Sequence, residues 1–343
     1  MLSVAIVGAG GIGHIRAKSI LDSQQGRVLW VADVDAGRAK ELAALSSSSA
    51  TIEWREAVSN PEVDAVVVSP PTKFHAEIAI QALEAGKHVL CEKPLARTVE
   101  EARAIVEAAQ RAGRVLKTGF NYRQMGHVRK AQELLKCGAI GPPYYLRCRY
   151  GHGGRPGYEE HWCTDADLSG GGVLQEQGIH MVDLVRVLLG EPVKVMAETR
   201  RFFWGFPEVE DNCFCLFETA AGRLAQVHAS WTEWKNVLEI EIFGHDGYLR
   251  LEGRDGHYGP QRLTWGKRQP THGRPVEEVF TFEETESSWD REWCEFVELI
   301  RDGNDSLEVA RQGLETQQLI EAAYRSAREH AWIEILPIHR ERP

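Results

Sequence analysis

The chain has 343 residues, of which 43% are hydrophobic and 26% charged, as in a globular protein long enough for two domains with their own cores. Its net charge of −10, with no Lys/Arg-rich run, argues against a general nucleic-acid surface. No apolar run approaches the roughly 18 residues that span a bilayer, and Met1 leads almost directly into the first expected strand, without room for a signal peptide. Seven cysteines without a C-x-x-C pair favour reduced thiols, so we expect a cytoplasmic protein with no membrane partner.

A strand, a glycine turn and a helix open the chain. The apolar run Val4–Val7 leads into glycines spaced G-x-G-x-x-G, and a helix follows. The first glycine permits a tight turn, the second lets the backbone approach a pyrophosphate, and the third lets the helix pack on the strand. The helix N-terminus then offers N–H groups and a positive dipole end to the phosphates. The expected dinucleotide-binding residues of this turn are Gly8, Gly10, Gly11, Ile12 and Gly13.

An acidic residue follows at the spacing that a dinucleotide site requires. Asp33 lies twenty residues after Gly13, at the end of the strand expected over Val28–Ala32. Its carboxylate can accept hydrogen bonds from both adenosine ribose hydroxyls and would repel a 2′-phosphate, which favours NAD over NADP. Arg38 is near enough in sequence to meet a phosphate, but we interpret it as a solvated residue of the next helix.

Strands and helices continue to alternate through residue 122. Strands are expected over Ala65–Val68, His88–Cys91 and Val115–Thr118, with helices over Phe74–Ala85 and from the capping box at Thr98 to Ala112. This rhythm predicts an α/β fold, with a doubly wound parallel sheet over residues 1–122. Ser46–Ser49 is expected to be a loop.

Residues 123–343 show a different pattern, typical of an α+β domain. After a helix over His127–Lys136, strands follow with few intervening helices, and short turns between them predict a large, mostly antiparallel open sheet. Because a second subunit would cover the open face of this sheet, we expect a homodimer or homotetramer. The expected strands are Tyr144–Tyr150, Val193–Phe203, Asn212–Thr219, Arg223–Trp231, Val237–Phe243, Tyr248–Leu251 and Val276–Phe282, and the closing helices are Trp289–Arg301 and Leu307–His330.

Lys93 lies at the carboxyl end of an expected parallel strand, in Cys91-Glu-Lys-Pro94. Ligands of open α/β sheets bind at such ends. Hydride transfer to or from an alcohol needs a group that takes or gives the hydroxyl proton, and a partly desolvated lysine beside a cationic nicotinamide can do both. A surface lysine at a strand end is the plainer alternative.

A second candidate group follows three glycines. Glu176, His180 and Asp183 are spaced i, i+4, i+7, so on a helix they share one stripe. A carboxylate that sets an imidazole tautomer suits a proton relay. A polar surface face with a capping acid is the alternative, and Gly170-Gly-Gly, which permits close approach of a ligand, favours the functional interpretation.

These motifs resemble the Gfo/Idh/MocA family of oxidoreductases over nearly the whole chain. The resemblance implies an N-terminal Rossmann domain and a C-terminal domain whose open sheet is often paired between subunits. It rests on the Gly8–Gly13 turn with Asp33, Ser69-Pro-Pro-Thr-Lys-Phe-His75, Ala85-Gly-Lys-His-Val-Leu-Cys-Glu-Lys-Pro94, Gly119-Phe-Asn-Tyr-Arg123, Gly170-Gly-Gly-Val-Leu with the His180 helix, and Glu321-Ala-Ala-Tyr-Arg-Ser-Ala327.

The resemblance also implies roles for particular residues. Lys93 would be catalytic and would orient the substrate, and His180 would be the general acid/base. Many polyol dehydrogenases of the family carry Asp four residues before this histidine, whereas this chain has Glu176, which argues against assuming a cyclic-polyol substrate. The residues that would line the cofactor are Ser69, Pro70, His75, Glu92 and Asn121, together with Lys93.

Aromatic and polar side chains of the second half are candidate walls of a substrate pocket. Sugar rings pack their C–H faces on aromatic rings while their hydroxyls need polar partners. Each tryptophan taken alone is also a candidate core residue. The pocket candidates, besides Lys93, Glu176 and His180, are Arg123, Tyr150, His152, His161, Trp162 and Trp231. No His/Cys spacing matches a zinc site, so we expect no metal.

The sequence therefore predicts an NAD(P)-dependent oxidoreductase acting on a secondary alcohol or ketone of a sugar, polyol or sugar derivative. A reductase working mainly from the reduced cofactor is the same chemistry in the other direction. A non-catalytic dinucleotide or sugar sensor is an alternative, although such a sensor has no need of both Lys93 and His180. A glycosidase that uses tightly bound NAD for transient oxidation is another.

Overall fold

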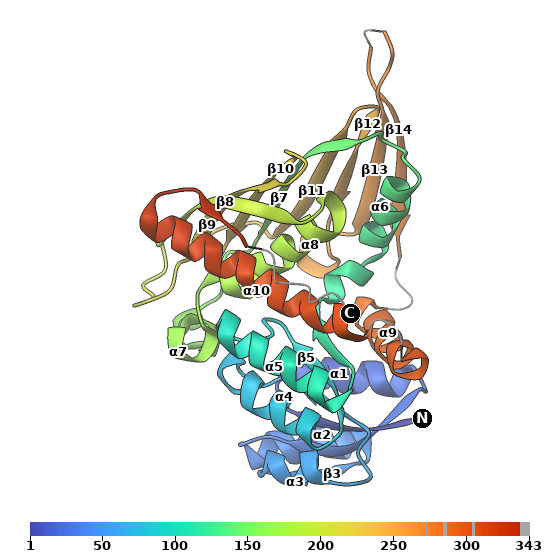
Figure 1. The fold of residues 1–343 in the computed structure, drawn as a ribbon, viewed down its shortest axis with the longest axis vertical. Helices are drawn as coiled ribbons and strands as arrows, with labels where there is room; N and C mark the ends of the chain where they lie inside the picture. Colours follow the sequence, from blue (N-terminus) through green and yellow to red (C-terminus); the bar gives the residue numbers. More distant parts are fainter. Residues whose placement is uncertain (272, 284–286, 304–305, 337–343) are drawn as a thin grey trace. The chain divides into compact units, whose positions relative to one another are not determined.

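The computed structural model describes residues 1–271, 273–283, 287–303 and 306–336, and the chain divides into two compact units. The first unit comprises Met1–Asn121, Asp167–Gly170 and Glu286–Gln317, and the second comprises Tyr122–Ala166, Gly171–Thr285 and Gln318–Pro343 (Figure 1). Both units therefore draw on segments that are far apart in the sequence.

The first unit is built on a six-stranded parallel sheet with the order β3-β2-β1-β4-β5-β6. This order reverses between β1 and β4, which is the point at which doubly wound sheets bind dinucleotides. The strands are β1 (Leu2–Val7), β2 (Gly26–Ala32), β3 (Ser49–Thr51), β4 (Ala65–Val68), β5 (His88–Glu92) and β6 (Leu116–Gly119).

Helices cover both faces of this sheet. Helix α5 begins at the predicted cap, because the Thr98 side chain accepts a hydrogen bond from the Glu101 N–H, and it ends at Gly113 in the left-handed conformation. Helix α9 packs on α1, and its Trp293 and Phe296 join the core formed by β1, β2 and α1. The helices of this unit are α1 (Gly11–Asp22), α2 (Ala36–Ser46), α3 (Trp54–Ser59), α4 (His75–Glu84), α5 (Val99–Ala112) and α9 (Ser288–Asp302).

The second unit contains a nine-stranded mixed sheet with the order β14-β13-β12-β11-β7-β10-β9-β8-β15. The pairing is antiparallel except between β7 and β10, which run parallel. The strands are β7 (Pro143–Gly151), β8 (Pro192–Arg200), β9 (Asn212–Thr219), β10 (Leu224–Ser230), β11 (Val237–Gly244), β12 (Gly247–Glu252), β13 (Gln261–Lys267), β14 (Val276–Phe282) and β15 (Ile333–Glu334).

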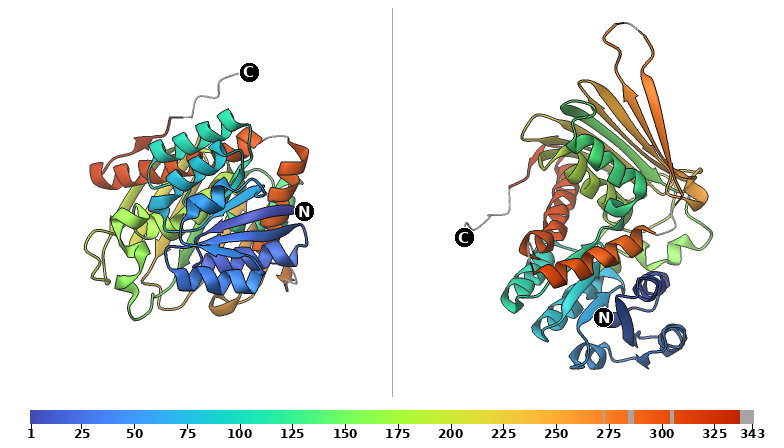
Figure 2. Two further views of the ribbon diagram at one scale, coloured as in Figure 1. Left: turned by 90° about the horizontal axis from the view of Figure 1, so that it is seen from below. Right: turned by 90° about the vertical axis from the view of Figure 1, so that its right-hand side faces the viewer.

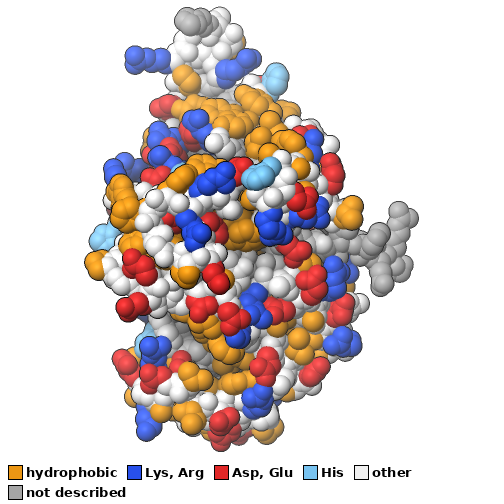
Figure 3. Space-filling model, turned by 90° about the vertical axis from the view of Figure 1, so that its left-hand side faces the viewer, with side chains coloured by type: hydrophobic (Ala, Val, Ile, Leu, Met, Phe, Trp, Pro, Cys, Tyr) orange, Lys and Arg blue, Asp and Glu red, His pale blue; other side chains and the backbone are white. Residues whose placement is uncertain are grey.

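Helices pack on one face of the nine-stranded sheet (Figure 2). Helix α8 (Ile179–Leu189) lies against β7 and β10, and α6 (Gly126–Lys136) lies against β12, β13 and β14. The side chains that alternate with the buried ones, such as Arg147, Phe214 and Gln226, are exposed on the other face. Two helices, α7 (Ala166–Ser169) and α10 (Ser306–Glu329), contribute residues to both units. Acidic, basic and hydrophobic side chains are interspersed on the face drawn in Figure 3.

The structure confirms the predicted fold class and most predicted elements, and it corrects three details. The strand expected over Val193–Phe203 ends at Arg200, because the Asp211 carboxylate accepts hydrogen bonds from three consecutive N–H groups that begin at Phe202 and turn the chain away. Strand β13 was not predicted. Ser49, expected in a loop, begins the short edge strand β3.

Candidate active site

The glycine turn at the start of α1 has the shape of a phosphate cradle. Gly8 has φ +101°, a conformation that favours glycine, and a Cβ there would lie 2.5 Å from the Pro70 nitrogen. A residue with a side chain therefore does not fit at this position. A Cβ on Gly13 would overlap the Gly8 carbonyl oxygen. Gly10 and Gly11, in contrast, have open space where a side chain would be. The turn is thus tight against protein on one side and open at the N–H groups that begin α1, which fits a dinucleotide pyrophosphate.

Asp33 and Ser69 form hydrogen bonds with the backbone of this turn. The Asp33 carboxylate accepts hydrogen bonds from the N–H groups of Ala9, at 2.7 Å, and Asp35, at 2.9 Å. The Ser69 hydroxyl lies 2.9 Å from the Gly8 carbonyl oxygen, to which it donates. The remaining lone pairs of Asp33 still suit ribose hydroxyls, so the residue can hold the turn and the cofactor together.

His75 links the two loops that follow β4 and β5. Its Nδ1 lies 2.8 Å from the Pro94 carbonyl oxygen and its Nε2 lies 2.9 Å from the Pro70 carbonyl oxygen. Burial lowers the pKa of His75, and a neutral ring donates through only one of these nitrogens. The imidazole therefore bridges the segments that the sequence assigned to the cofactor.

Lys93 lies between two fixed neighbours at the carboxyl end of β5. On one side, Glu92 is buried and its Oε1 lies 2.6 Å from Nη2 of Arg16, which comes from α1. On the other side, the Lys93–Pro94 peptide is cis, and the Pro94 carbonyl meets His75. The Lys93 side chain is half-buried.

Arg16 was not predicted from the sequence. It is 1% exposed, its Nη2 also lies 2.7 Å from Oε2 of Glu292 on α9, and its guanidinium packs over the Trp289 ring. A Cβ on Gly119 would lie 2.7 Å from Nη2 of Arg16, so the glycine at the end of β6 makes room for this network.

Asn121, expected near the cofactor, follows β6. Its Nδ2 donates to the Ser288 hydroxyl at 2.9 Å, and its buried Oδ1 accepts no hydrogen bond from the described residues. An unsatisfied acceptor next to the carboxyl end of the sheet is available to a donor of a bound ligand.

In the second unit, Glu176 and His180 lie on two different kinds of helical turn. Glu176 belongs to a π-helical turn, η5 (Leu174–Gly178), which leads directly into α8. The expected single α-helical stripe is therefore interrupted between Glu176 and His180, as is frequent at functional sites. The Glu210 carboxylate holds the start of this turn, because it accepts hydrogen bonds from the N–H groups of Gly172 and Leu174.

The three glycines before η5 make room for protein atoms. A Cβ on Gly171 would overlap the Tyr324 hydroxyl, and one on Gly172 would overlap the Glu210 carbonyl. Packing within the unit thus accounts for these two glycines, for which the sequence predicted the close approach of a ligand.

His180 is 5% exposed and its ring stacks on Tyr122, with centroids 3.9 Å apart and planes at 7°. Asp183, the third member of the expected relay, accepts hydrogen bonds from Arg123 at Nε and Nη2, the former at 2.7 Å. Arg123, which was predicted from the sequence to bind the substrate, therefore has a carboxylate partner within the second unit. The stacked ring of Tyr122 is the neighbour of His180 that the sequence did not single out.

Tyr122 begins an aromatic cluster around a second arginine. Its hydroxyl lies 2.5 Å from that of Tyr150, and both phenol oxygens accept hydrogen bonds from Nη1 of Arg254. The Arg254 guanidinium also packs over the Tyr258 ring, 4.5 Å from its centroid. Tyr150 was a pocket candidate, whereas Arg254 and Tyr258 carried no sequence signal beyond their place in a glycine-rich turn.

The other pocket candidates lie around Tyr158. His152 and His161 each pack a ring on it, and His161 also contacts the ring of Trp162. The His152 Nδ1 accepts a hydrogen bond from the Gly154 N–H, and burial lowers the pKa of His152, so its neutral form carries the proton on Nε2. Trp231 is fully buried against Tyr158 and serves the core rather than a pocket wall.

Two searches over the described residues bear on function. No group of three or more His, Cys, Asp or Glu side chains within that part of the chain is arranged to hold a metal ion. Among the helices described, none combines the length and the apolar character needed to cross a membrane.

A doubly wound sheet with an open glycine cradle at its switch point is the arrangement of a dinucleotide-binding enzyme. Residues 2–120 match the family model described as an oxidoreductase family with an NAD-binding Rossmann fold, and residues 128–250 match the GFO/IDH/MocA C-terminal domain. The chain belongs to the GFO/IDH/MocA family, and NAD is its cofactor.

Similar proteins with assigned names support this membership. The chain is 34% identical to levoglucosan dehydrogenase of Pseudarthrobacter phenanthrenivorans over 293 residues, which cover 74% of this chain and 75% of that one. It is 31% identical to inositol 2-dehydrogenase 3 of Saccharopolyspora erythraea, with 72% of each chain covered. Among solved structures, an oxidoreductase domain protein from Kribbella flavida aligns over 98% of this chain and 99% of that one, with a TM-score of 0.88 and 26% identity.

Proposed function

We propose that this protein transfers hydride between NAD and a secondary alcohol or ketone of a sugar, a polyol or a sugar derivative. The observation that carries the proposal is the buried His180 ring, held flat against Tyr122 just after a π-helical turn that bears Glu176. The names of the relatives agree, because they refer to levoglucosan, to inositol and, for a reductase of Ensifer adhaerens, to 1,5-anhydro-D-fructose.

The residues of this chain would divide the work as follows. Bound NAD accepts or supplies the hydride. The glycine cradle and Asp33 hold the dinucleotide, while Glu92 and His75 fix the backbone on either side of Lys93. Lys93 would orient the reacting hydroxyl through its Nζ, and His180 would take or return the hydroxyl proton.

The test is turnover of NAD to NADH, followed by absorbance, against a panel of sugars, inositols and sugar acids. Lys93→Ala and His180→Gln are each expected to lower kcat about 10²–10⁴-fold, the range typical of general acid–base groups. Lys40→Ala, a change at an exposed lysine of α2, is the matched control. Full activity of either active-site variant would refute the proposed roles.

The sensor and bound-cofactor alternatives make different predictions. A sensor would bind NADH and give no turnover with any substrate, and Lys93→Ala would not change its response. A glycosidase would cleave a glycoside with no net NADH, and its cofactor would stay bound through gel filtration.

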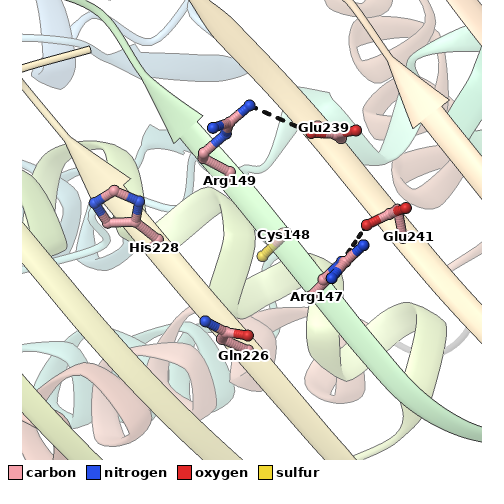
Figure 4. Close-up of a pocket in the computed structure, with 7 residues that line it drawn as sticks. All are labelled: Arg147, Cys148, Arg149, Gln226, His228, Glu239 and Glu241. Atoms are coloured by element: carbon pink, nitrogen blue, oxygen red, sulfur yellow. Dashed lines mark hydrogen bonds and ion pairs between the residues drawn. The ribbon is translucent and has the colours of Figure 1, made fainter.

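We also propose that the open face of the nine-stranded sheet pairs with a second copy of the chain. A hollow of about 310 Å³ on this face is lined by residues of β7, β10 and β11 (Figure 4). Arg147 pairs with Glu241 and Arg149 with Glu239, so basic and acidic rows lie side by side. Such a surface is complementary in charge to its own copy under two-fold symmetry. Exposed Phe214 on β9 adds apolar area.

Oligomeric state tests this pairing. Light scattering after gel filtration is expected to give a dimer or tetramer, and Arg147→Glu together with Phe214→Asp is expected to give a smaller species. A wild-type monomer at micromolar concentration would contradict the pairing.

A further inference from the structure

Arg254 carries a positive charge that is held by neutral groups. It follows β12 in a turn, and its Nη1 donates to the hydroxyls of Tyr122 and Tyr150, the latter at 3.2 Å. The ring of Tyr258 lies under its guanidinium. Burial raises the pKa of Tyr150 and of Tyr258, so these phenols stay neutral and do not balance the charge.

Within the described part of the chain, Arg254 makes no ion pair with a carboxylate. Asp255, its neighbour, is exposed and accepts a hydrogen bond from Nε2 of Gln261 instead. Arg16 and Arg186, which are buried, and Arg123, which is half-buried, each have at least one carboxylate within 2.8 Å. Arg254 is half-buried, so nitrogens of its guanidinium that no protein group engages are open to an acceptor that a ligand brings.

The site around Arg254 has the features of an anion subsite beside the candidate acid/base group. One aromatic ring, that of Tyr122, separates Arg254 from His180, since Tyr122 stacks on the imidazole and binds the guanidinium through its hydroxyl. Nη1 is engaged by the phenols, whereas Nε and Nη2 make no hydrogen bond with the described residues, which leaves two of the three nitrogens for a carboxylate.

We propose that Arg254 binds a carboxylate of the substrate, so that the protein acts on a sugar acid, such as a uronic or aldonic acid, rather than on a neutral sugar. This inference rests on the proposed oxidoreductase function. Because the Tyr122 ring lies between the two groups, the carboxylate would be several bonds away from the hydroxyl that reacts at His180.

The experiment compares kcat/KM for matched pairs of a neutral hexose and its uronic acid, with NAD in excess. Wild type is expected to prefer the acid, and Arg254→Gln is expected to lose about 10–10² in kcat/KM for the acid, the usual worth of a charge-assisted hydrogen bond. The same variant should change kcat/KM for the neutral hexose by less than about threefold, because that sugar has no carboxylate to bind. The kcat/KM of Arg254→Lys for the acid should lie between those of wild type and Arg254→Gln, because lysine keeps the positive charge but lacks the paired N–H donors of a guanidinium.

Controls separate this role from a structural one. Arg129→Gln, at an exposed position of α6, should leave both substrates unchanged. Equal losses for acid and neutral sugar in Arg254→Gln would mean that Arg254 only packs the aromatic cluster, and would overturn the inference. A wild type that prefers the neutral sugar, or a sugar phosphate over the uronic acid, would overturn it as well.

Failure of the proposed function is distinguishable from failure of this inference. If no sugar, polyol or sugar acid is turned over, the oxidoreductase assignment is refuted, and calorimetric titration of the NADH-loaded protein with the hexuronate and the hexose still tests Arg254. Selective binding of the hexuronate that is lost in Arg254→Gln would sustain the anion subsite. Equal binding of the hexuronate and the hexose, or binding of neither, would overturn the anion subsite.

Discussion

Replacement of Arg16 by methionine should strongly destabilise the first unit. The guanidinium lies between Glu92 and Glu292, with oxygens at 2.6 Å and 2.7 Å from Nη2, and both carboxylates are buried. Breaking a buried ion pair by removing one partner typically costs about 3–5 kcal/mol, because the remaining charge is left in a poor solvent. Here two carboxylates lose their shared partner, so we expect the upper part of that range, about 4–5 kcal/mol. For a unit of this size that lowers Tm by roughly 10–15 °C.

The pH dependence of this loss identifies its cause. Burial raises the pKa of Glu292 even with Arg16 present, and without Arg16 the Glu292 carboxyl should bind a proton still more tightly in the folded state than in the unfolded chain. The stability deficit of Arg16→Met should therefore shrink as the pH is lowered from 7 toward 5. Urea unfolding at both values measures it, and adding Glu292→Gln should recover part of the loss because one buried charge is removed. A deficit below about 1 kcal/mol, or one that is the same at both pH values, would refute this reasoning.

Three further predictions concern stability and cofactor binding. Burial lowers the pKa of His127 to about 4, so between roughly pH 6.5 and 4 the unfolded chain binds a proton that the folded chain does not. Lowering the pH through this range should therefore remove about 3 kcal/mol of stability. In His127→Gln the midpoint of urea unfolding should depend less on pH over the same range. Gly13→Ala should weaken NADH binding in a fluorescence titration by at least about tenfold, because the new Cβ overlaps the Gly8 carbonyl oxygen. Burial alone would raise the pKa of Asp211, but hydrogen bonds from backbone N–H groups, including that of Phe202, outweigh it and lower this pKa. The stability that the Asp211 carboxylate contributes is therefore present above the ordinary Asp pKa and lost as the pH falls through the lowered pKa. Asp211→Asn should cost about 1–3 kcal/mol of stability at pH 7, measured by thermal unfolding.

Local signals predicted most of the fold because they act within a few residues. The cap of α5 and the alternation of β9 lie in stretches whose own chemistry determines the conformation, and both were predicted to within a residue. Strand β13 was missed because Gln261–Lys267 has few apolar residues and owes its conformation to pairing with β12 and β14. The edge strand β3 has only three residues, and its pairing with β2 makes it a strand.

The residues of the candidate site likewise fall into those that local sequence motifs predicted and those that depend on distant parts of the chain. Lys93 and His180 were found because short motifs surround them, and their assigned roles remain predictions. Arg254 could not be found, since its partner Tyr122 is 132 residues away in sequence and no local pattern links them. The partner of Asp183 was missed for a related reason: spacing along a helix says which face a residue is on, but not that Arg123 would lie against it.

Arg16 and Arg254 should respond differently to substitution, because their partners differ. Arg16 is balanced by two carboxylates, so its removal leaves unpaired charge and lowers stability. Arg254 is held by phenols, so its removal leaves neutral hydroxyls that can still bond one another, as the 2.5 Å contact between Tyr122 and Tyr150 allows. Arg254→Gln should therefore lower Tm by only a few degrees while it changes which substrates are accepted. If Arg254→Gln were as destabilising as Arg16→Met, the guanidinium would be part of the core, and the carboxylate subsite would have no basis.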